Sequence, residues 1–177
     1  MSDGVELYPA DPGWPAAFEA ERSTILPLFA ATPLLIEHMG STAIPGLAAK
    51  PVIDILVLVA DLQSGRAAIP ALEALGYAYW ADNPDKGKLF LVKGLPPAPR
   101  RTHHLHILDD ADEVRRRLLF RDHLRTHPEV RDAYLALKQD LAALYSDDRE
   151  AYTNAKSDFI DSVVNALGGP ARRGLPA

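Results

Sequence analysis

Apolar and polar positions alternate with two different periods in the first part of the chain. Apolar residues at helical spacing follow the Asp-Pro-Gly-Trp turn and predict an N-terminal helix, with Pro15 in its first turn and Pro27 near its end. Short aliphatic and β-branched runs predict about five strands. These runs cover residues 34–40, 51–60, 77–80, 88–94 and 101–109. Residues 61–76 predict one helix that ends at Gly76.

From Asp112 onward the pattern becomes helical. One amphipathic helix precedes Pro128, a second begins there, and a third covers residues 146–167 with Ser146 as its N-cap. The order of helix, mixed sheet and three helices indicates an α+β or α/β domain. Residues 1–168 fit a single domain, and the Gly/Pro-rich residues 169–177 predict a flexible tail.

Composition limits the function classes. The 177 residues are 47% hydrophobic and 24% charged, which is an ordinary globular balance. The absence of cysteine excludes disulfides, thiolate metal sites and a cysteine nucleophile. The longest apolar run, residues 51–60, is shorter than the roughly 20 residues that span a bilayer. The first residues lack the pattern of a signal peptide, so we expect a cytoplasmic protein that does not bind membranes.

The net charge of -5 argues against a protein that binds duplex nucleic acid through a basic face. A local basic pocket for a phosphate is compatible with that charge. Lys50, Arg121 and Lys156 are the candidates for such a pocket, while most other basic residues are expected on a solvated surface.

Asp54 is unusual because it lies within the most aliphatic strand. Alternation places it on one strand face with Leu56 and Leu58, opposite Ile53 and Ile55. A carboxylate there must be hydrogen-bonded, paired or bound to a cation. It could accept hydrogen bonds from the preceding loop, or it could face a cleft and hold a metal or a substrate. We favour the second interpretation.

The turn Gly40-Ser41-Thr42 precedes this strand. Glycine permits close approach of a ligand, the two hydroxyls can donate to it, and a following helix N-terminus can bind phosphate. On the tripeptide alone, a simple capped turn is the preferred interpretation.

The stretch "HHLHIL" places His104 and His106 on one strand face, with His103 on the other. Two imidazoles on one face can bind one metal, contact phosphate oxygens or act as acid and base. If this strand neighbours the Asp54 strand, Asp54, His104 and His106 could together hold zinc.

Several separate stretches together resemble the GrpB family, which is assigned to the nucleotidyltransferase superfamily. They are "DPGWPAAFEAER", "HMGSTAIPGLAAKPVIDILVLV", "RTHHLHIL", "LLFRDHLRTHPEVRDAYLALKQDLA" and "YTNAKSDFI". The resemblance covers nearly the whole chain. It implies a nucleotidyltransferase-like α+β fold, with a twisted mixed sheet, an N-terminal helix and a C-terminal helical subregion.

The superfamily pattern has a Gly-Ser turn, a strand with two carboxylates separated by one residue, and a third carboxylate on a later strand. These acids hold two divalent cations. Gly40-Ser41 and Asp54 match the pattern, but Leu56 occupies the second carboxylate position, and the later strand offers His104 and His106. Histidine favours zinc or another transition metal over Mg²⁺.

The resemblance implies a metal-dependent enzyme that acts on a nucleoside triphosphate and a small acceptor, with Asp54, His104 and His106 as catalytic and metal-binding residues. Gly40, Ser41 and Thr42 would contact phosphate or substrate, together with the three basic candidates. Two alternatives remain open. The chain could bind a nucleotide or another phosphate-containing small molecule without turnover, or it could be a transition-metal-dependent hydrolase that uses the histidine pair.

Overall fold

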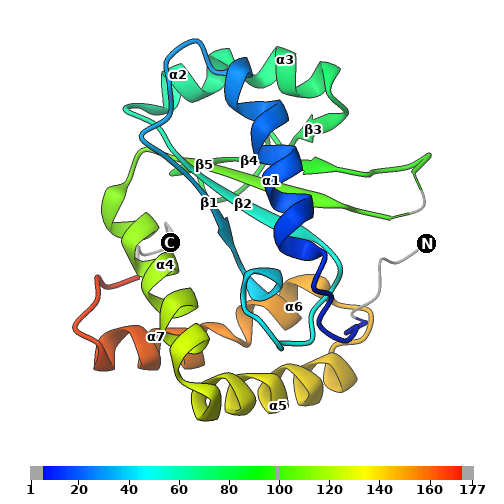
Figure 1. Cartoon of the computed structure of the whole chain (residues 1–177), viewed down its shortest axis with the longest axis vertical. Helices are drawn as coiled ribbons and strands as arrows, with labels where there is room; N and C mark the ends of the chain where they lie inside the picture. The colour runs from blue at the N-terminus through cyan, green and yellow to red at the C-terminus, as the bar shows by residue number, and fades with distance from the viewer. Residues whose placement is uncertain (1–5, 99, 173–177) are drawn as a thin grey trace.

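A computed structural model describes residues 6–98 and 100–172. Five strands form one mixed sheet in the order β1-β2-β5-β4-β3 (Figure 1). The strands are β1 (Leu35–Met39), β2 (Ile53–Leu58), β3 (Tyr77–Tyr79), β4 (Lys88–Lys93) and β5 (His103–Leu108). The sequence prediction of about five strands in a mixed sheet is confirmed.

The central pair of strands is parallel, and the other pairs are antiparallel. In the parallel pair, Asp54 lies opposite His104 and Leu56 lies opposite His106. The two strands that carry the candidate metal ligands are therefore neighbours, which the sequence alone left open.

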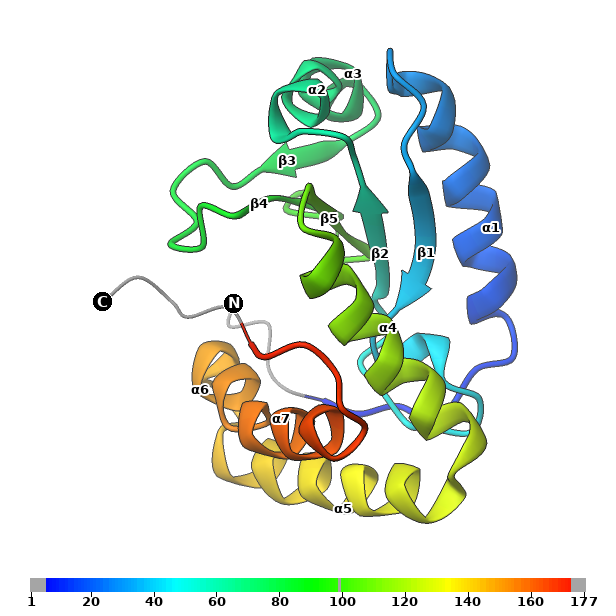
Figure 2. The ribbon, with the colours of Figure 1, turned by 90° about the vertical axis from the view of Figure 1, so that its left-hand side faces the viewer.

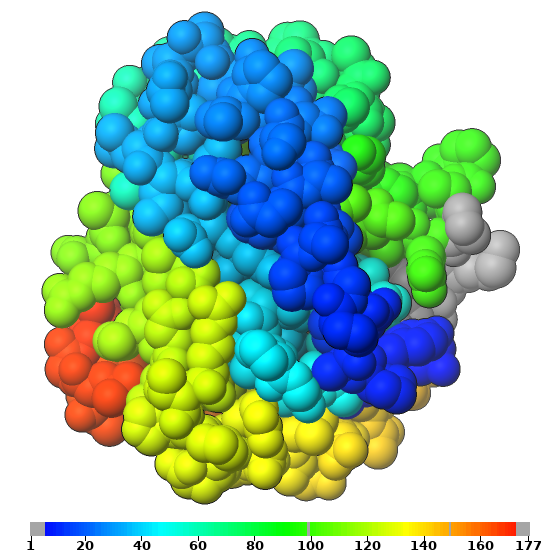
Figure 3. Space-filling view, viewed as in Figure 1, coloured from blue at the N-terminus to red at the C-terminus, as the bar shows by residue number. Residues whose placement is uncertain are grey.

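Three helices cover one face of the sheet. They are α1 (Trp14–Ile25), α2 (Leu62–Ala67) and α3 (Ile69–Ala74), and a short 3₁₀ turn, η1 (Leu26–Leu28), follows the first. The odd-numbered residues of β2 and β5 point to this face and form the main core with α1. Figure 3 shows the side chains of α1 lying across this side of the molecule. Pro15 lies in the first turn of α1, as predicted.

Only part of the opposite face packs against a helix. The helix α4 (Ala111–Thr126) lies on β1 and β2, on the side away from α1 (Figure 2). The C-terminal helices α5 (Pro128–Leu144), α6 (Arg149–Asn154) and α7 (Ser157–Ala166) lie beyond one end of the sheet. The 3₁₀ turn η2 (Ser41–Ala43) and the residues after it join them through a second core, in which Ile44 and Leu47 meet Phe120 and Tyr134.

Two predicted helices are each divided in two. Residues 61–76 form α2 and α3, because Pro70 has no N–H group to continue the helical hydrogen-bond ladder. The predicted helix over residues 146–167 is also wrong as one element. Its N-cap is Asp148, whose carboxylate accepts from the Ala151 N–H at 2.9 Å, and not Ser146. The break between α6 and α7 lets Tyr152 and Phe159 pack in different surroundings.

The predicted flexible tail lies partly outside the described residues. Within it, the Gly169 N–H donates to the Val164 carbonyl at 2.9 Å, so the first part of the segment closes the end of α7. Across residues 6–98 and 100–172, no helix combines the length and apolar character that crossing a membrane requires.

Candidate functional site

A cleft of about 930 Å³ opens on the part of the sheet face formed by β5, β4 and β3. Even-numbered residues of the strands form its floor, and α4, α6 and α7 supply the facing wall. Its volume is within the range of pockets that hold small molecules and cofactors. The candidate residues on the strands, Asp54, His104 and His106, line this cleft and are therefore accessible to a ligand within it.

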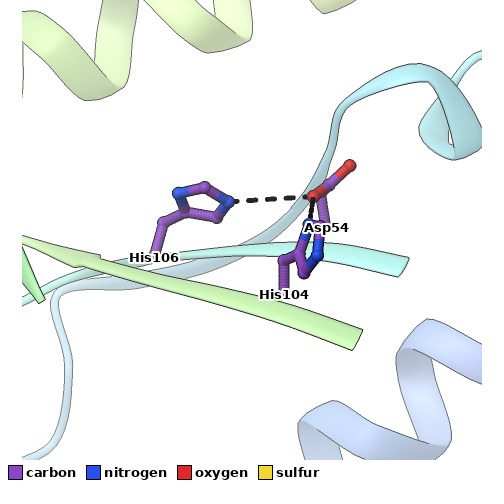
Figure 4. A group of neighbouring side chains, drawn as sticks. All are labelled: Asp54, His104 and His106. Atoms are coloured by element: carbon purple, nitrogen blue, oxygen red, sulfur yellow. Dashed lines mark hydrogen bonds and ion pairs between the residues drawn. The ribbon is translucent and has the colours of Figure 1, made fainter. Parts of the chain in front are cut away.

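Asp54, His104 and His106 converge on the floor of this cleft (Figure 4). The Asp54 Oδ1 lies 3.0 Å from the His104 Nδ1 and 3.7 Å from the His106 Nε2. One ligand atom from each residue lies within 4.8 Å of the other two. A tetrahedral ion with bonds of about 2.1 Å places its ligand atoms roughly 3.4 Å apart, so this spacing suits a single metal ion.

The electrostatics of Asp54 and His106 favour a carboxylate beside a neutral imidazole. Burial alone would raise the pKa of Asp54, but the adjacent imidazoles of His104 and His106 outweigh it and hold that pKa below its ordinary value. Burial lowers the pKa of His106 to about 3, although Asp54 opposes the shift. His106 is therefore neutral at physiological pH, which is the form that binds metals.

Two buried nitrogens at this position lack a partner. The His104 Nε2 and the His106 Nδ1 make no hydrogen bond to any residue that the structure describes. Buried polar atoms are rarely left in this state, and ligating histidines usually use both ring nitrogens. These are not the ring nitrogens that approach Asp54, so an ion held beside the Asp54 Oδ1 would leave both of them unpaired.

Gly40 packs its backbone directly against Asp54. Its φ of 71° lies in a region that side chains rarely adopt, and a Cβ atom there would lie 2.5 Å from the Asp54 Oδ2. Glycine is thus required at this turn both for its conformation and for the space that the carboxylate fills.

Ser41 follows this glycine and lines the cleft. Its hydroxyl accepts a hydrogen bond of 3.1 Å from the Lys138 ammonium group, which also donates to the Ala48 carbonyl at 2.5 Å. Lys138 is only 1% exposed, and burial with the nearby charges of Lys156 and Lys50 lowers its pKa to about 7. No carboxylate pairs with it among residues 6–98 and 100–172.

Lys50 and Lys156 also line the cleft. Their ammonium groups lie 4.7 and 3.9 Å from the centre of the buried Tyr152 ring. Together with Lys138 they gather positive charge at the end of the cleft near Ser41. The structure thus brings together two of the basic residues selected from the sequence, although they are far apart in the chain.

Thr42 and Arg121 have structural partners. The Thr42 hydroxyl is buried, donates to the Val52 carbonyl at 3.2 Å and contacts the His38 ring. Arg121 lines the cleft, but Glu37 and Asp122 each accept from it at 2.7 Å. Burial acts to lower the pKa of Arg121, and its two carboxylate partners raise it. Its charge is therefore largely neutralised within the protein.

The cleft is predominantly basic, although the whole chain is acidic. Its basic lining residues are Lys50, Lys88, Arg101, Arg116, Arg117, Arg121, Lys156 and Arg172, and its acidic ones are Asp54, Asp85, Glu113 and Glu150. Sequence reasoning did not select Lys138, although it lies one helical turn after the buried Tyr134, on the same face of α5. A charged residue in the apolar stripe of that helix was the available signal.

Comparisons with known proteins agree on the family and the fold. The GrpB protein family model matches residues 4–166. A UPF0157 protein of Pseudomonas aeruginosa is 45% identical over 92% of this chain and 67% of its own length. The crystal structure of conserved protein GrpB from Enterococcus faecalis has a TM-score of 0.81 at 34% identity, and the match covers 91% of this chain and 96% of that one.

A more distant likeness links the fold to nucleotidyltransferases. Cid1, in complex with its short product ApU, has a TM-score of 0.55 at 13% identity, over 84% of this chain and 48% of that one. A second structure, of the Cid1 poly(U) polymerase with MgGTP bound, has a TM-score of 0.53 at 16% identity, over 77% of this chain and 44% of that one. At these identities the likeness shows the fold alone, and it confirms the predicted nucleotidyltransferase-like architecture.

Proposed function

This chain belongs to the GrpB family, and from that premise we propose that it binds a nucleoside triphosphate in the cleft and transfers its nucleotidyl group to a small acceptor. The observation that carries the proposal is the convergence of Asp54, His104 and His106 beside the Gly40-Ser41 turn. The two Cid1 structures contain ApU and MgGTP, which supports a nucleotide as the ligand in a cleft of the same fold.

The donor set fits one divalent transition metal. Two imidazole nitrogens and one carboxylate oxygen are the ligands that zinc and similar ions prefer. The set does not fit a pair of Mg²⁺ ions, because Leu56 occupies the second carboxylate position and is 0% exposed. Such a cation would supply positive charge opposite the phosphate oxygens and an acceptor oxygen.

The residues of the chain itself would bind and orient the triphosphate. The Gly40 backbone lies beside Asp54, and Ser41, Lys50 and Lys156 line the same cleft. In the transfer, the oxygen of an acceptor hydroxyl bonds to the α-phosphorus, and the proton of that hydroxyl passes to solvent. The bond from that phosphorus to the bridging oxygen breaks, and pyrophosphate leaves.

The leucine at position 56 supports a second candidate function, in which the protein binds a nucleotide without turnover. The side chain at this position is fully buried and packs with Met39, Leu108 and Val114. It therefore supports the core, and a second cation cannot take a ligand from it. The two candidates differ only in what happens to the bound nucleotide.

Metal binding is tested first. Protein prepared without a histidine tag is incubated with Zn²⁺ or Mn²⁺, desalted and subjected to elemental analysis. We expect about one ion per chain in the wild type and roughly tenfold weaker binding in Asp54→Asn and His106→Gln. His103→Gln is the matched control, because it changes the same strand on its opposite face. Wild-type metal content in Asp54→Asn would contradict the site.

Turnover is tested with labelled nucleoside triphosphates, each with Mg²⁺, Mn²⁺ or Zn²⁺, in the presence and absence of small hydroxyl acceptors. Pyrophosphate release that depends on an acceptor supports transfer. Calorimetric binding without any release supports the binding module. Release in water alone supports the third possibility, a metal-dependent hydrolase that uses the histidine pair.

A further inference from the structure

Trp80 is an exposed aromatic residue at the sheet-edge end of the cleft. Its side chain is 50% exposed, whereas the other tryptophan, Trp14, is 7% exposed and lies in the main core. Trp80 lines both the cleft and an adjoining cavity of about 180 Å³. A large apolar ring that remains half exposed at the rim of a pocket is a typical ligand contact.

The backbone holds Trp80 in a defined place. Its N–H donates to the Phe90 carbonyl at 2.9 Å, which continues the β3–β4 ladder, and its own carbonyl accepts from the Asn83 N–H at 3.3 Å. The turn that follows is closed by Asn83 and Asp85, whose side chains accept from the N–H groups of Asp85 and Gly87. The indole is therefore presented by an ordered strand end.

A row of aromatic rings connects Trp80 to the candidate metal site. The Trp80 and Phe90 ring centroids lie 6.0 Å apart, and Phe90 lies 4.7 Å from His106. These residues lie on adjacent strands, because Phe90 is the β4 partner of His106. Two strand spacings, roughly 10 Å, thus separate Trp80 from the metal-candidate strand, which is a span that one nucleotide can bridge.

We propose that Trp80 forms a stacking subsite for the heteroaromatic ring of the ligand, while the phosphates of the same ligand lie at the Ser41 end of the cleft. The inference rests on the proposed nucleotide ligand and adds where its base is bound. The two ends of the cleft suit the two parts of such a molecule, since Trp80 and Phe90 supply aromatic surface and Lys50 and Lys156 supply positive charge.

The test compares ligands that have and lack a ring. Binding of ATP, GTP, CTP and UTP and of inorganic tripolyphosphate is measured by calorimetry, with tryptophan fluorescence as a second readout. Stacking contributes enough for us to expect at least one nucleotide to bind roughly tenfold tighter than tripolyphosphate. That nucleotide should quench the emission of Trp80, and Trp14→Phe should retain the quenching.

Substitutions test whether the tighter binding of the nucleotide depends on the Trp80 ring. Trp80→Ala should lose roughly tenfold in nucleotide affinity and keep the wild-type affinity for tripolyphosphate, and Trp80→Tyr should restore most of the loss. Leu34→Ala removes another exposed apolar side chain, which lies outside the cleft lining, and should change neither affinity. Equal nucleotide affinity in Trp80→Ala and wild type would overturn the subsite.

The test also separates this inference from the function on which it rests. If tripolyphosphate and all four nucleotides bind with the same affinity, the stacking subsite is wrong and the phosphate end of the cleft stands. If none of these compounds binds to the wild type, with or without Zn²⁺ or Mn²⁺, both proposals are overturned.

Discussion

Gly40 has two roles, one in the backbone conformation of the turn and one in positioning the Asp54 carboxylate. It has a positive φ and leaves room for the Asp54 carboxylate, and both requirements exclude other residues. Gly76 has a positive φ of 94° as well, but a Cβ atom there would meet nothing within 4 Å. The two glycines therefore form a natural comparison.

We expect Gly40→Ala to lower the free energy of unfolding by about 1–3 kcal/mol through backbone strain, and in addition to displace Asp54. Metal affinity should fall roughly tenfold in this variant. Gly76→Ala should show a loss of stability from strain with unchanged metal affinity. Denaturant unfolding and elemental analysis measure the two effects, and equal metal binding in both variants would contradict the role of Gly40.

His38 is buried as a neutral imidazole. Its Nε2 lies 2.9 Å from the Thr42 Oγ1, and that hydroxyl uses its only hydrogen to donate to the Val52 carbonyl. The His38 Nε2 must therefore carry a hydrogen. The ring also stacks on Phe18 at 4.9 Å. Burial lowers the pKa of His38 to about 4.

Because this pKa is below the value of about 6.5 in an unfolded chain, protonation favours unfolding. The stabilising contribution of neutral His38 is present above pH 6.5 and is lost as the pH falls towards 4. We expect the free energy of unfolding of the wild type to fall by about 3 kcal/mol more over this range than that of His38→Gln. Chemical denaturation at several pH values measures this, with His123→Gln as the control. Parallel curves would refute the assignment.

At the scale of elements, α5 carries a buried lysine across from the Gly-Ser turn. Lys138 contacts Ser41 and lies 5.4 Å from the Tyr134 ring centre, and its surroundings lower its pKa to about 7. The ordinary value in an unfolded chain is about 10.4. The neutral amine is thus favoured in the folded state, so stability rises with pH between these values.

We expect the free energy of unfolding of the wild type to increase by roughly 4 kcal/mol from pH 7 to pH 10 because of this group. Lys138→Met, which keeps the length of the side chain, should remove the increase and be the more stable protein near neutral pH. Addition of tripolyphosphate at pH 7.5 should cause proton uptake in the wild type only. A pH dependence unchanged by the substitution would contradict this account.

The strands and their polar faces could be predicted from the sequence, whereas the order in which the strands pair in the sheet could not. Alternation in β2 and β5 places Asp54, His104 and His106 on the face opposite the core, as expected. That β2 pairs with β5 depends on how the intervening helices and hairpin cross the sheet, and a period of two residues carries no information on this. The breaks after α2 and α6 were missed because each apolar pattern continues through them.

The C-terminal helices illustrate a different limit. Lys156 was selected because it is basic. It lies near Lys50 only because α6 packs against the loop before β2, so that both ammonium groups contact the Tyr152 ring. Trp80 was read only as part of a strand, since exposure at a sheet edge cannot be recognised from alternation. Contacts between distant segments therefore decide which polar and aromatic residues belong to the site.

At the scale of the whole molecule, an acidic chain concentrates basic side chains in one cleft. Low-dielectric walls strengthen the local field, while dissolved salt weakens it. We expect the affinity for tripolyphosphate to fall roughly tenfold between low and high ionic strength. Lys156→Glu should cause a comparable loss at low salt, measured by calorimetry. Arg22→Glu, which reverses a charge on the exposed side of α1, is the control, and an equal loss in both variants would contradict a localised field.

The parallel pairing of β2 with β5 has a consequence for synthesis on the ribosome. Asp54 emerges long before its partner His104, and Lys156 emerges later still. A nascent chain that ends before α4 contains all five strands and the three residues of the metal-candidate cluster, but it lacks the wall that carries Lys156 and Tyr152. If the proposed phosphate-bearing ligand binds here, its charged end would find a complete site only after the last helices have been synthesised and have packed against the sheet.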